Sequence, residues 1–144
     1  MRWHRLRFRG EDGQVTVFVA IAMLGLIAVV GLVADGGRVF AERRDLQNVA
    51  DAAALAGAMQ IDVDAYRASG EVVLDEGATR EAAVEYLQDE RDVEYAVQVS
   101  QASVEVAVSL QASTTFLKLI GIDGVGISAS SSSSPRHGIS EAGE

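Results

Sequence analysis

The chain has 144 residues, a formal net charge of −9 at pH 7 and no cysteine. The lack of cysteine excludes disulfides, thiolate metal sites and cysteine nucleophiles. The acidic balance argues against nucleic acid as a partner, because such binding depends on neutralising phosphates with Lys and Arg. The length leaves room for one small domain beside the apolar stretch near the N-terminus.

Residues 15–34 form an apolar stretch, VTVFVAIAMLGLIAVVGLVA, without a charge, an amide or a proline. At ~1.5 Å of rise per residue, a helix of this length crosses the ~30 Å hydrocarbon core of a bilayer. Residues 1–14 are a short basic tail with four arginines, which favours a cytoplasmic N-terminus and an extracytoplasmic C-terminal part. We expect Gly10 and Gly13 to keep this tail out of the helix.

A cleavable signal peptide is the alternative interpretation of the same stretch, and it would release a small secreted binding protein. The run is longer than the 7–15 apolar residues usual in signal peptides, and Leu32 stands where a cleavage site needs a small residue. The sequence therefore favours an uncleaved anchor in contact with the lipid bilayer.

Three small residues recur within the span at every third position, namely Gly25, Ala28 and Gly31. They form a narrow strip along which a second helix can approach closely. Glycine and alanine are also common in membrane helices generally, so the strip can equally be without a partner.

Residues 35–60 predict an extramembrane amphipathic helix that continues the span. Gly36 and Gly37 would allow a bend at its start, at about 1 kcal/mol each relative to alanine. Apolar residues at alternating spacings of three and four form one stripe, which either contacts partner proteins or packs against the chain's own sheet; its members are Val39, Leu46, Val49 and Ala53.

Residues 61–131 predict a small α+β domain. The stretch up to Gly77 is rich in turn residues and should be a loop with a short helical piece. A second helix is expected from Thr79, as its N-cap, to about Glu90. Its inward face should carry Ala83, Tyr86 and Leu87.

Alternating apolar residues over 93–99 and 104–111 predict two antiparallel strands joined as a hairpin. Residues 114–120, TTFLKLI, should form a short apolar turn or helix, and a third strand is expected from Gly124 to about Ser131. Residues 132–144 are predicted to be a disordered tail. The fold class is thus α+β: a long N-terminal helix, a small antiparallel sheet of about three strands and one or two short helices.

The sequence has no combination of residues that is typical of a catalytic or metal-binding site. The only histidines, His4 and His137, lie in the two tails. Asp62 and Asp64 begin like a calcium loop, but Tyr66 stands where the third oxygen ligand belongs. No spacing nominates the carboxylate pair that an anchored hydrolase would need, so we expect no catalytic residue, metal, cofactor or small-molecule substrate.

Residues 12–58 closely resemble the N-terminal module of the TadE/TadG-like proteins, which assist assembly of Flp (tight adherence) pili. The matching elements are Gly13 before the span, the Asp35-Gly36-Gly37-Arg38 group at its end, and the block of residues 46–58 that begins with Leu46, Gln47, Asn48 and contains Asp51. The chain is similar to a short TadG-type member, without room for the additional adhesion-type domain of larger ones.

The resemblance implies a type IV pilin-like (pseudopilin-like) architecture in the bacterial cytoplasmic membrane and a non-enzymatic role in an Flp pilus or a related secretion assembly at the cell surface. The implied partners are other pilus-assembly or pilin-like membrane proteins. Gly13 and Gln14 are the candidate processing site. Pilins usually carry a glutamate early in the apolar segment, and this chain has none there, so processing and entry into a filament stay open.

Overall fold

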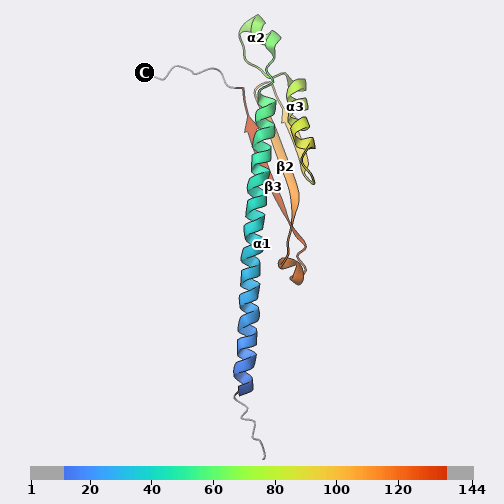
Figure 1. Ribbon diagram of the computed structural model, residues 1–144. Helices are drawn as coiled ribbons and strands as arrows, with labels where there is room; N and C mark the ends of the chain where they lie inside the picture. The colour runs from blue at the N-terminus through green and yellow to red at the C-terminus, as the bar shows by residue number, and fades with distance from the viewer. Residues whose placement is uncertain (1–11, 136–144) are drawn as a thin grey trace, which may run out of the picture.

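The computed structural model describes residues 12–135 and shows one long helix lying along a small antiparallel sheet (Figure 1). The α+β fold predicted from the sequence is confirmed. In chain order the elements are α1 (Asp12–Ala58), α2 (Val63–Ser69), α3 (Glu76–Gln88), β1 (Glu94–Val99), β2 (Val104–Ser113), the 3-10 helix η1 (Leu117–Ile120) and β3 (Gly124–Ser133).

Helix α1 is continuous over 47 residues. It includes Gly13, so the expectation that this glycine keeps the tail out of the helix is wrong. It also passes through Gly36 and Gly37 without a break. Helix formation is cooperative, and the cost of about 1 kcal/mol for each glycine is small beside the hydrogen bonds and packing on either side of the pair.

Helix α3 begins earlier than predicted, because Asp75 rather than Thr79 is its N-cap. The Asp75 carboxylate accepts hydrogen bonds from the backbone N–H groups of Gly77 and Ala78, both at 3.0 Å. Thr79 is instead buried on the inner face with Ala83 and Leu87. The predicted inward residue Tyr86 is 42 % exposed, because the spacing of four residues between Thr79, Ala83 and Leu87 leaves it beside the buried face.

The sheet has the order β1-β2-β3, with both pairs antiparallel. The predicted hairpin of β1 and β2 is present, with Val97 opposite Val106. Strand β3 extends two residues beyond its expected end, because Ser132 and Ser133 pair with Glu105 and Val104 of β2. These two serines therefore belong to the sheet and not to the tail to which the sequence analysis assigned them.

The core lies where α1 and α3 pack on one face of the sheet (Figure 1). The C-terminal half of α1, residues 35–58, here called its outer half, contributes small side chains, with Ala50, Ala53 and Ala54 fully buried. At Gly57 an added Cβ would stand 3.1 Å from the carbonyl oxygen of Thr79. The many small residues of this half therefore permit close approach of α1 to α3 and β2.

Candidate functional site on the long helix

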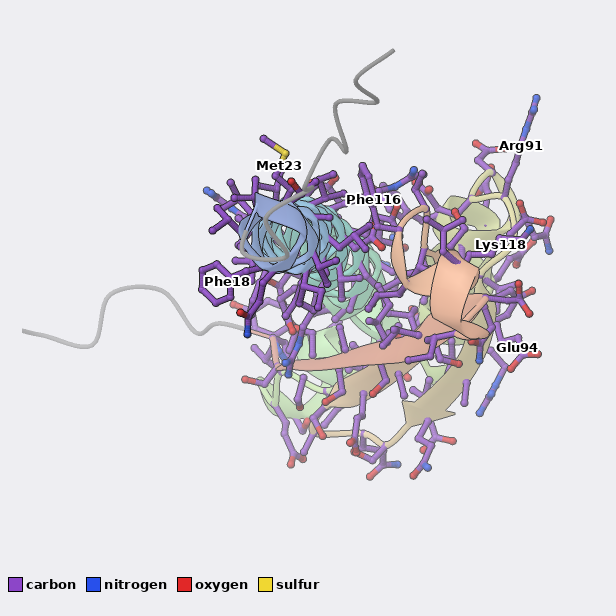
Figure 2. All side chains as sticks on the ribbon, turned by 90° about the horizontal axis from the view of Figure 1, so that it is seen from below. Phe18, Met23, Arg91, Glu94, Phe116 and Lys118 are labelled. Carbon is purple, nitrogen blue, oxygen red and sulfur yellow. The ribbon has the colours of Figure 1, made fainter. Side chains whose placement is uncertain are left out.

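The N-terminal half of α1 extends beyond the sheet with its apolar side chains open. Phe18 is 73 % exposed and Leu24 is 67 % exposed, and Figure 2 shows Phe18 and Met23 pointing away from the rest of the protein. Within residues 12–135, α1 is the one helix long and apolar enough to cross a membrane, and only 6 % of its apolar 18-residue window is buried. A core helix of a soluble domain would bury such a window, whereas this surface suits lipid.

Asp35 lies at the end of this apolar half and is the point at which the β2–β3 connection joins the helix. Its side chain accepts three backbone hydrogen bonds, from the N–H groups of Thr115 (3.1 Å), Phe116 (2.8 Å) and Leu117 (2.7 Å). These groups stand at the start of η1, whose first N–H groups have no partner within the helix. Asp35 thus caps a short helix some 80 residues further along the chain.

The same hydrogen bonds set the ionisation of Asp35. The N–H of Leu117 has the largest effect and lowers the pKa of the carboxyl group, and Thr115, Phe116 and the nearby charge of Arg38 act in the same direction. Burial opposes them, since the residue is only 3 % exposed. The donors prevail, so Asp35 is a carboxylate at neutral pH.

Gly31 provides the second contact between the apolar half of α1 and this connection. It is buried, and a Cβ added to it would stand 2.7 Å from the Cβ of Phe116. A side chain at position 31 would therefore displace the Phe116 ring. Figure 2 shows Phe116 beside α1, viewed along the helix from its N-terminal end.

The other members of the Asp35-Gly36-Gly37-Arg38 group stay on the helix surface. Gly36 and Gly37 have open space where a Cβ would be. Arg38 forms an ion pair with Glu42 at 2.8 Å, one turn further along α1. An exposed pair of this kind contributes little to stability, so Asp35 is the residue of the group that reaches across to the sheet domain.

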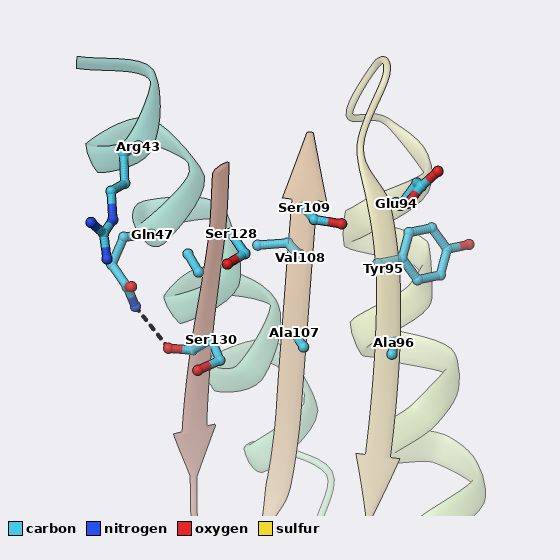
Figure 3. Close-up of a pocket in the computed structure, with 11 residues that line it drawn as sticks. Arg43, Gln47, Glu94, Tyr95, Ala96, Ala107, Val108, Ser109, Ser128 and Ser130 are labelled. Atoms are coloured by element: carbon cyan, nitrogen blue, oxygen red, sulfur yellow. Dashed lines mark hydrogen bonds between the residues drawn. The ribbon is translucent and has the colours of Figure 1, made fainter. Parts of the chain in front are cut away.

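The block of residues 46–58 forms a second junction, with the edge strand β3. Leu46 is buried in the core. The Gln47 amide donates to the carboxylate of Asp51 and to the carbonyl oxygen of Ser130, both at 3.0 Å, and Figure 3 shows the bond to Ser130. Hydrogen bonds from Ser131 and then Gln47 lower the pKa of Asp51.

The hydrogen bonds of Gln47 connect α1 to the edge strand β3. The amide of Gln47 occupies one backbone acceptor on the free edge of β3, which protects that edge from pairing with another strand. Asn48, by contrast, is exposed on α1.

The apolar stripe of the outer half lies on the chain's own core. Leu46 and Ala53 are at most 2 % exposed, and Val39 and Val49 are partly buried against the core cluster. Packing on the sheet, one of the two roles considered for the stripe, is thus the one seen here. The strip in the span divides: Gly31 is covered by Phe116, whereas an added Cβ at Gly25 would meet nothing within 4 Å.

The candidate processing site lies in the first turn of α1, where Gly13 and Gln14 are both exposed. Ala28, in the middle of the strip, lines a small apolar hollow of about 180 Å³ together with Leu24, Phe116 and Leu119. The other apolar residues around this hollow are Ile27, Leu32 and Leu117.

The outer face of the sheet is shallow and carries small side chains across its middle. Figure 3 shows the hollow over it, about 650 Å³, with Ala96, Ala107 and Ser130 in one row across the three strands. Only Arg43, on α1, and Glu94 bring charge to its lining. This hollow offers a smooth surface and no set of convergent reactive groups.

Residues 12–135 contain no group of three or more His, Asp or Glu side chains that could hold a metal ion. The calcium-like pattern at Asp62 has a structural explanation, because its carboxylate accepts from the N–H groups of Asp64 and Ala65 and caps α2. The two histidines, His4 and His137, lie outside the described residues.

The partners of Asp35 could not be predicted from the sequence. They are backbone N–H groups, which leave no trace in residue identity, and they lie in a different element. The available signal was the apolar character of residues 116–122 in a connection, where turn residues are usually polar. Leu119 is 84 % exposed there, which marks the segment as unusual.

Residues 13–60 match the family model described as putative Flp pilus-assembly TadE/G-like. The resemblance to this family is therefore confirmed over the helix that carries Asp35 and the block of residues 46–58. No curated protein and no solved structure matches the chain significantly. The matched segment and the single long apolar helix fit a component of pilus assembly.

Proposed function

We propose that the chain is a membrane-anchored, pilin-like component of an Flp pilus or a related secretion assembly and that it acts without catalysis. In this proposal α1 crosses the bacterial cytoplasmic membrane once, with the basic N-terminus in the cytoplasm and the sheet domain outside. The matched family model over residues 13–60 supports the assignment to pilus assembly.

One observation carries the proposal: a single unbroken helix is both the apolar projection and the central element of the sheet domain. Its inner half leaves Phe18 and Leu24 exposed, while its outer half buries Leu46 and Ala53. Such a helix holds the external domain at a fixed height and rotation relative to the membrane. That property suits a subunit that must align with others.

The contacts with other pilus-assembly proteins are then assigned to the open part of the strip in the span. Leu46 and Ala53 have almost no surface left for a partner. Gly25 is open, since an added Cβ would meet nothing within 4 Å. Small residues in a membrane helix let a second backbone approach closely, so we assign the partner helix to this side.

Disulfide crosslinking tests this assignment. Because the chain has no native cysteine, each crosslink to it must involve the introduced one. Gly25→Cys is introduced into the full chain and expressed with the pilus components of its host, after which the membranes are oxidised. We expect a crosslinked species whose second member, identified by mass spectrometry, is a pilin-like or pilus-assembly protein carrying a matching cysteine in its own span.

The matched control is Leu26→Cys, one residue along and rotated by about 100° around the helix. Equal crosslinking of both variants would contradict a specific contact side. A crosslink from Gly25→Cys only to membrane proteins unrelated to pilus assembly would contradict the proposed function.

Release as a secreted binding protein is the competing function, and the mass of the mature N-terminus distinguishes the two. Cleavage before Asp35 would remove Gly31 from beneath Phe116 and put a charged amine on the residue that caps η1. This cost supports retention of the span. An intact Met1 or Arg2 would indicate a permanent anchor, a start at Gln14 would indicate pilin-type processing, and a start near Asp35 would overturn the anchored protein.

A further inference from the structure

We propose that residues 116–122, here called the foot loop, form a second membrane contact that dips into the lipid interface beside α1. This inference rests on the proposed function in one respect, namely that the inner half of α1 lies in a bilayer. It adds a lipid-binding surface in the sheet domain, which neither the span nor the family match assigns.

The first support is the apolar surface of the foot loop. Leu119 is 84 % exposed, Ile122 43 % and Phe116 40 %. Phe116 and Leu119 continue the apolar surface of the span, because they line one hollow with Leu24 and Leu32. A large exposed apolar surface in a connection costs free energy in water and gains it in lipid.

The second support is the state of the backbone. Polar groups that enter a membrane must find partners within the protein. In and beside the foot loop, Asp35 accepts from three N–H groups, and the N–H groups of Leu119, Gly121 and Ile122 donate to the carbonyl oxygens of Phe116, Lys118 and Leu117, respectively.

Just before the foot loop, Thr114 forms two hydrogen bonds across the connection between β2 and β3. Its N–H donates to the carbonyl oxygen of Asp123 at 3.2 Å, and its hydroxyl group donates to that of Ile122. A connection exposed to water has no need for these internal hydrogen bonds, because water can supply the partners. The buried carboxylate of Asp35 is what satisfies the three donors at the front of the foot loop.

The third support is depth. Phe116 packs on Gly31, four residues below Asp35 on α1, which corresponds to about 6 Å along the helix axis. Interfacial segments bury their apolar face by about 5–10 Å at the boundary of headgroups and acyl chains. Figure 1 shows the β2–β3 connection beside the inner part of α1 and the remainder of the sheet further out.

Lys118 fits the same placement. It lies next to Leu119, its side chain is 67 % exposed, and its only ion pair with Asp123 is long, at 3.9 Å, within the described residues. A lysine at this position can extend its ammonium group to the lipid phosphates while its methylene groups remain in the interface. The occupant we assign to the foot loop is therefore a phospholipid surface.

Tryptophan fluorescence in vesicles tests the inference. Trp3 is the only tryptophan, so Trp3→Phe provides a silent background for the full chain. Leu119→Trp is then placed in vesicles of phosphatidylcholine and phosphatidylglycerol that contain lipids brominated near the headgroup end of the acyl chain. Leu119 is so exposed that this substitution leaves the packing of the core unchanged.

We expect Leu119→Trp to show blue-shifted emission and to lose a large part of its intensity to the brominated lipid. Two variants in the same background calibrate the result. Phe18→Trp reports insertion of the span, and Ala102→Trp, in the exposed β1–β2 turn at the other end of the sheet, reports water.

The outcomes separate the two proposals. If Phe18→Trp is quenched but Leu119→Trp behaves like Ala102→Trp, the span is inserted and the foot loop inference is overturned. Blue-shifted emission of Leu119→Trp without quenching by lipid would mean that protein covers the foot loop, which also overturns it. If Phe18→Trp is not quenched either, the anchored function itself is wrong.

Discussion

The two halves of α1 have the same secondary structure and opposite surroundings. In the inner half Phe18 is 73 % exposed, whereas in the outer half Leu46 is 2 % exposed. The inner half is apolar on every side, and the outer half has one apolar stripe with charged residues around it. The distribution of apolar residues around the helix, and not helix propensity, therefore decides which half packs on protein.

Glycine shows the same contrast on a smaller scale. At Gly31 and Gly57 another side chain or carbonyl oxygen occupies the space that a Cβ would need, whereas Gly25, Gly36 and Gly37 face open space. The first two are required by close approach of other elements. The last three are not required by any contact within residues 12–135.

The largest effect on stability is expected from a charge placed in the core between the outer half of α1 and the sheet. Leu46→Asp puts an unpaired carboxylate into the core and should lower the free energy of unfolding by about 4 kcal/mol or more. That is a large part of the stability of a small domain. Loss of the near-ultraviolet circular dichroism of the tyrosines, in detergent, would report it. Leu55→Asp, at a half-exposed position on the same helix, is the control, and equal loss in both would refute the packing contrast.

A side chain at Gly31 should disturb the contact between α1 and the β2–β3 connection. Gly31→Leu displaces Phe116 and should cost about 1–3 kcal/mol, the usual range for overpacking. Hydrogen exchange at the amides of Thr115, Phe116 and Leu117 should accelerate, while the amides of β1 stay protected. Gly25→Leu is matched in chemistry but faces open space, and acceleration by that variant too would argue against a specific contact.

Asp35 should make the contact between α1 and the β2–β3 connection sensitive to acid. Its pKa is lowered from the ordinary 3.8 in the folded protein, so the ionised carboxylate stabilises the docked connection at any pH above about 4. That contribution is lost as the pH falls below this value towards the lowered pKa. The protection factor of the Leu117 amide, which is the exchange rate of an unstructured amide at the same pH divided by the observed rate, should therefore fall on acidification through this range.

Asp35→Asn separates this effect from general acid unfolding. The variant keeps the shape of the side chain but loses its charge, so the protection factor of the Leu117 amide should be lower at neutral pH and should lose most of its dependence on acid. An unchanged acid response in the variant would assign that response to another group. Asp51, whose pKa is also lowered, is the first to examine.

The smallest effect should be a gain. Gly37→Ala adds a methyl group in open space and should raise helix stability by up to about 1 kcal/mol. Gly57→Ala has the same propensity benefit, but its Cβ would lie 3.1 Å from the Thr79 carbonyl oxygen, so it should gain less or destabilise. Thermal unfolding of the two variants ranks them, and a larger gain for Gly57→Ala would contradict the close packing seen there.

The sequence was sufficient to predict α1 from a continuous apolar run followed by a stripe at helical spacing, and to predict the three strands from alternating apolar residues. Boundaries were less accurate where two signals compete. Asp75 and Thr79 are both acceptable N-caps, and burial of Thr79 under Gly57 decided between them. Ser132 and Ser133 have the composition of a linker, yet pairing with β2 makes them part of the strand.

The junction at Asp35 was beyond the reach of the sequence for a different reason. The group Asp35-Gly36-Gly37-Arg38 stood out by resemblance, but its partners are backbone groups of Thr115 to Leu117. No residue identity at those positions encodes a free N–H. Only the register of β2 and β3, which places their connection beside Gly31 and Asp35, brings the two segments together.

The hairpin of β2 and β3 also bears on the mechanics of the glycine pair. It lies beside α1 over residues 31–58. At one end Phe116 covers Gly31, and at the other end Ser132 and Ser133 share a hollow with Ala58. Gly36 and Gly37 lie within that length, so the hairpin supports α1 along the turns that have the lowest helix propensity. We therefore expect the hairpin to oppose bending of α1 at Gly36 and Gly37.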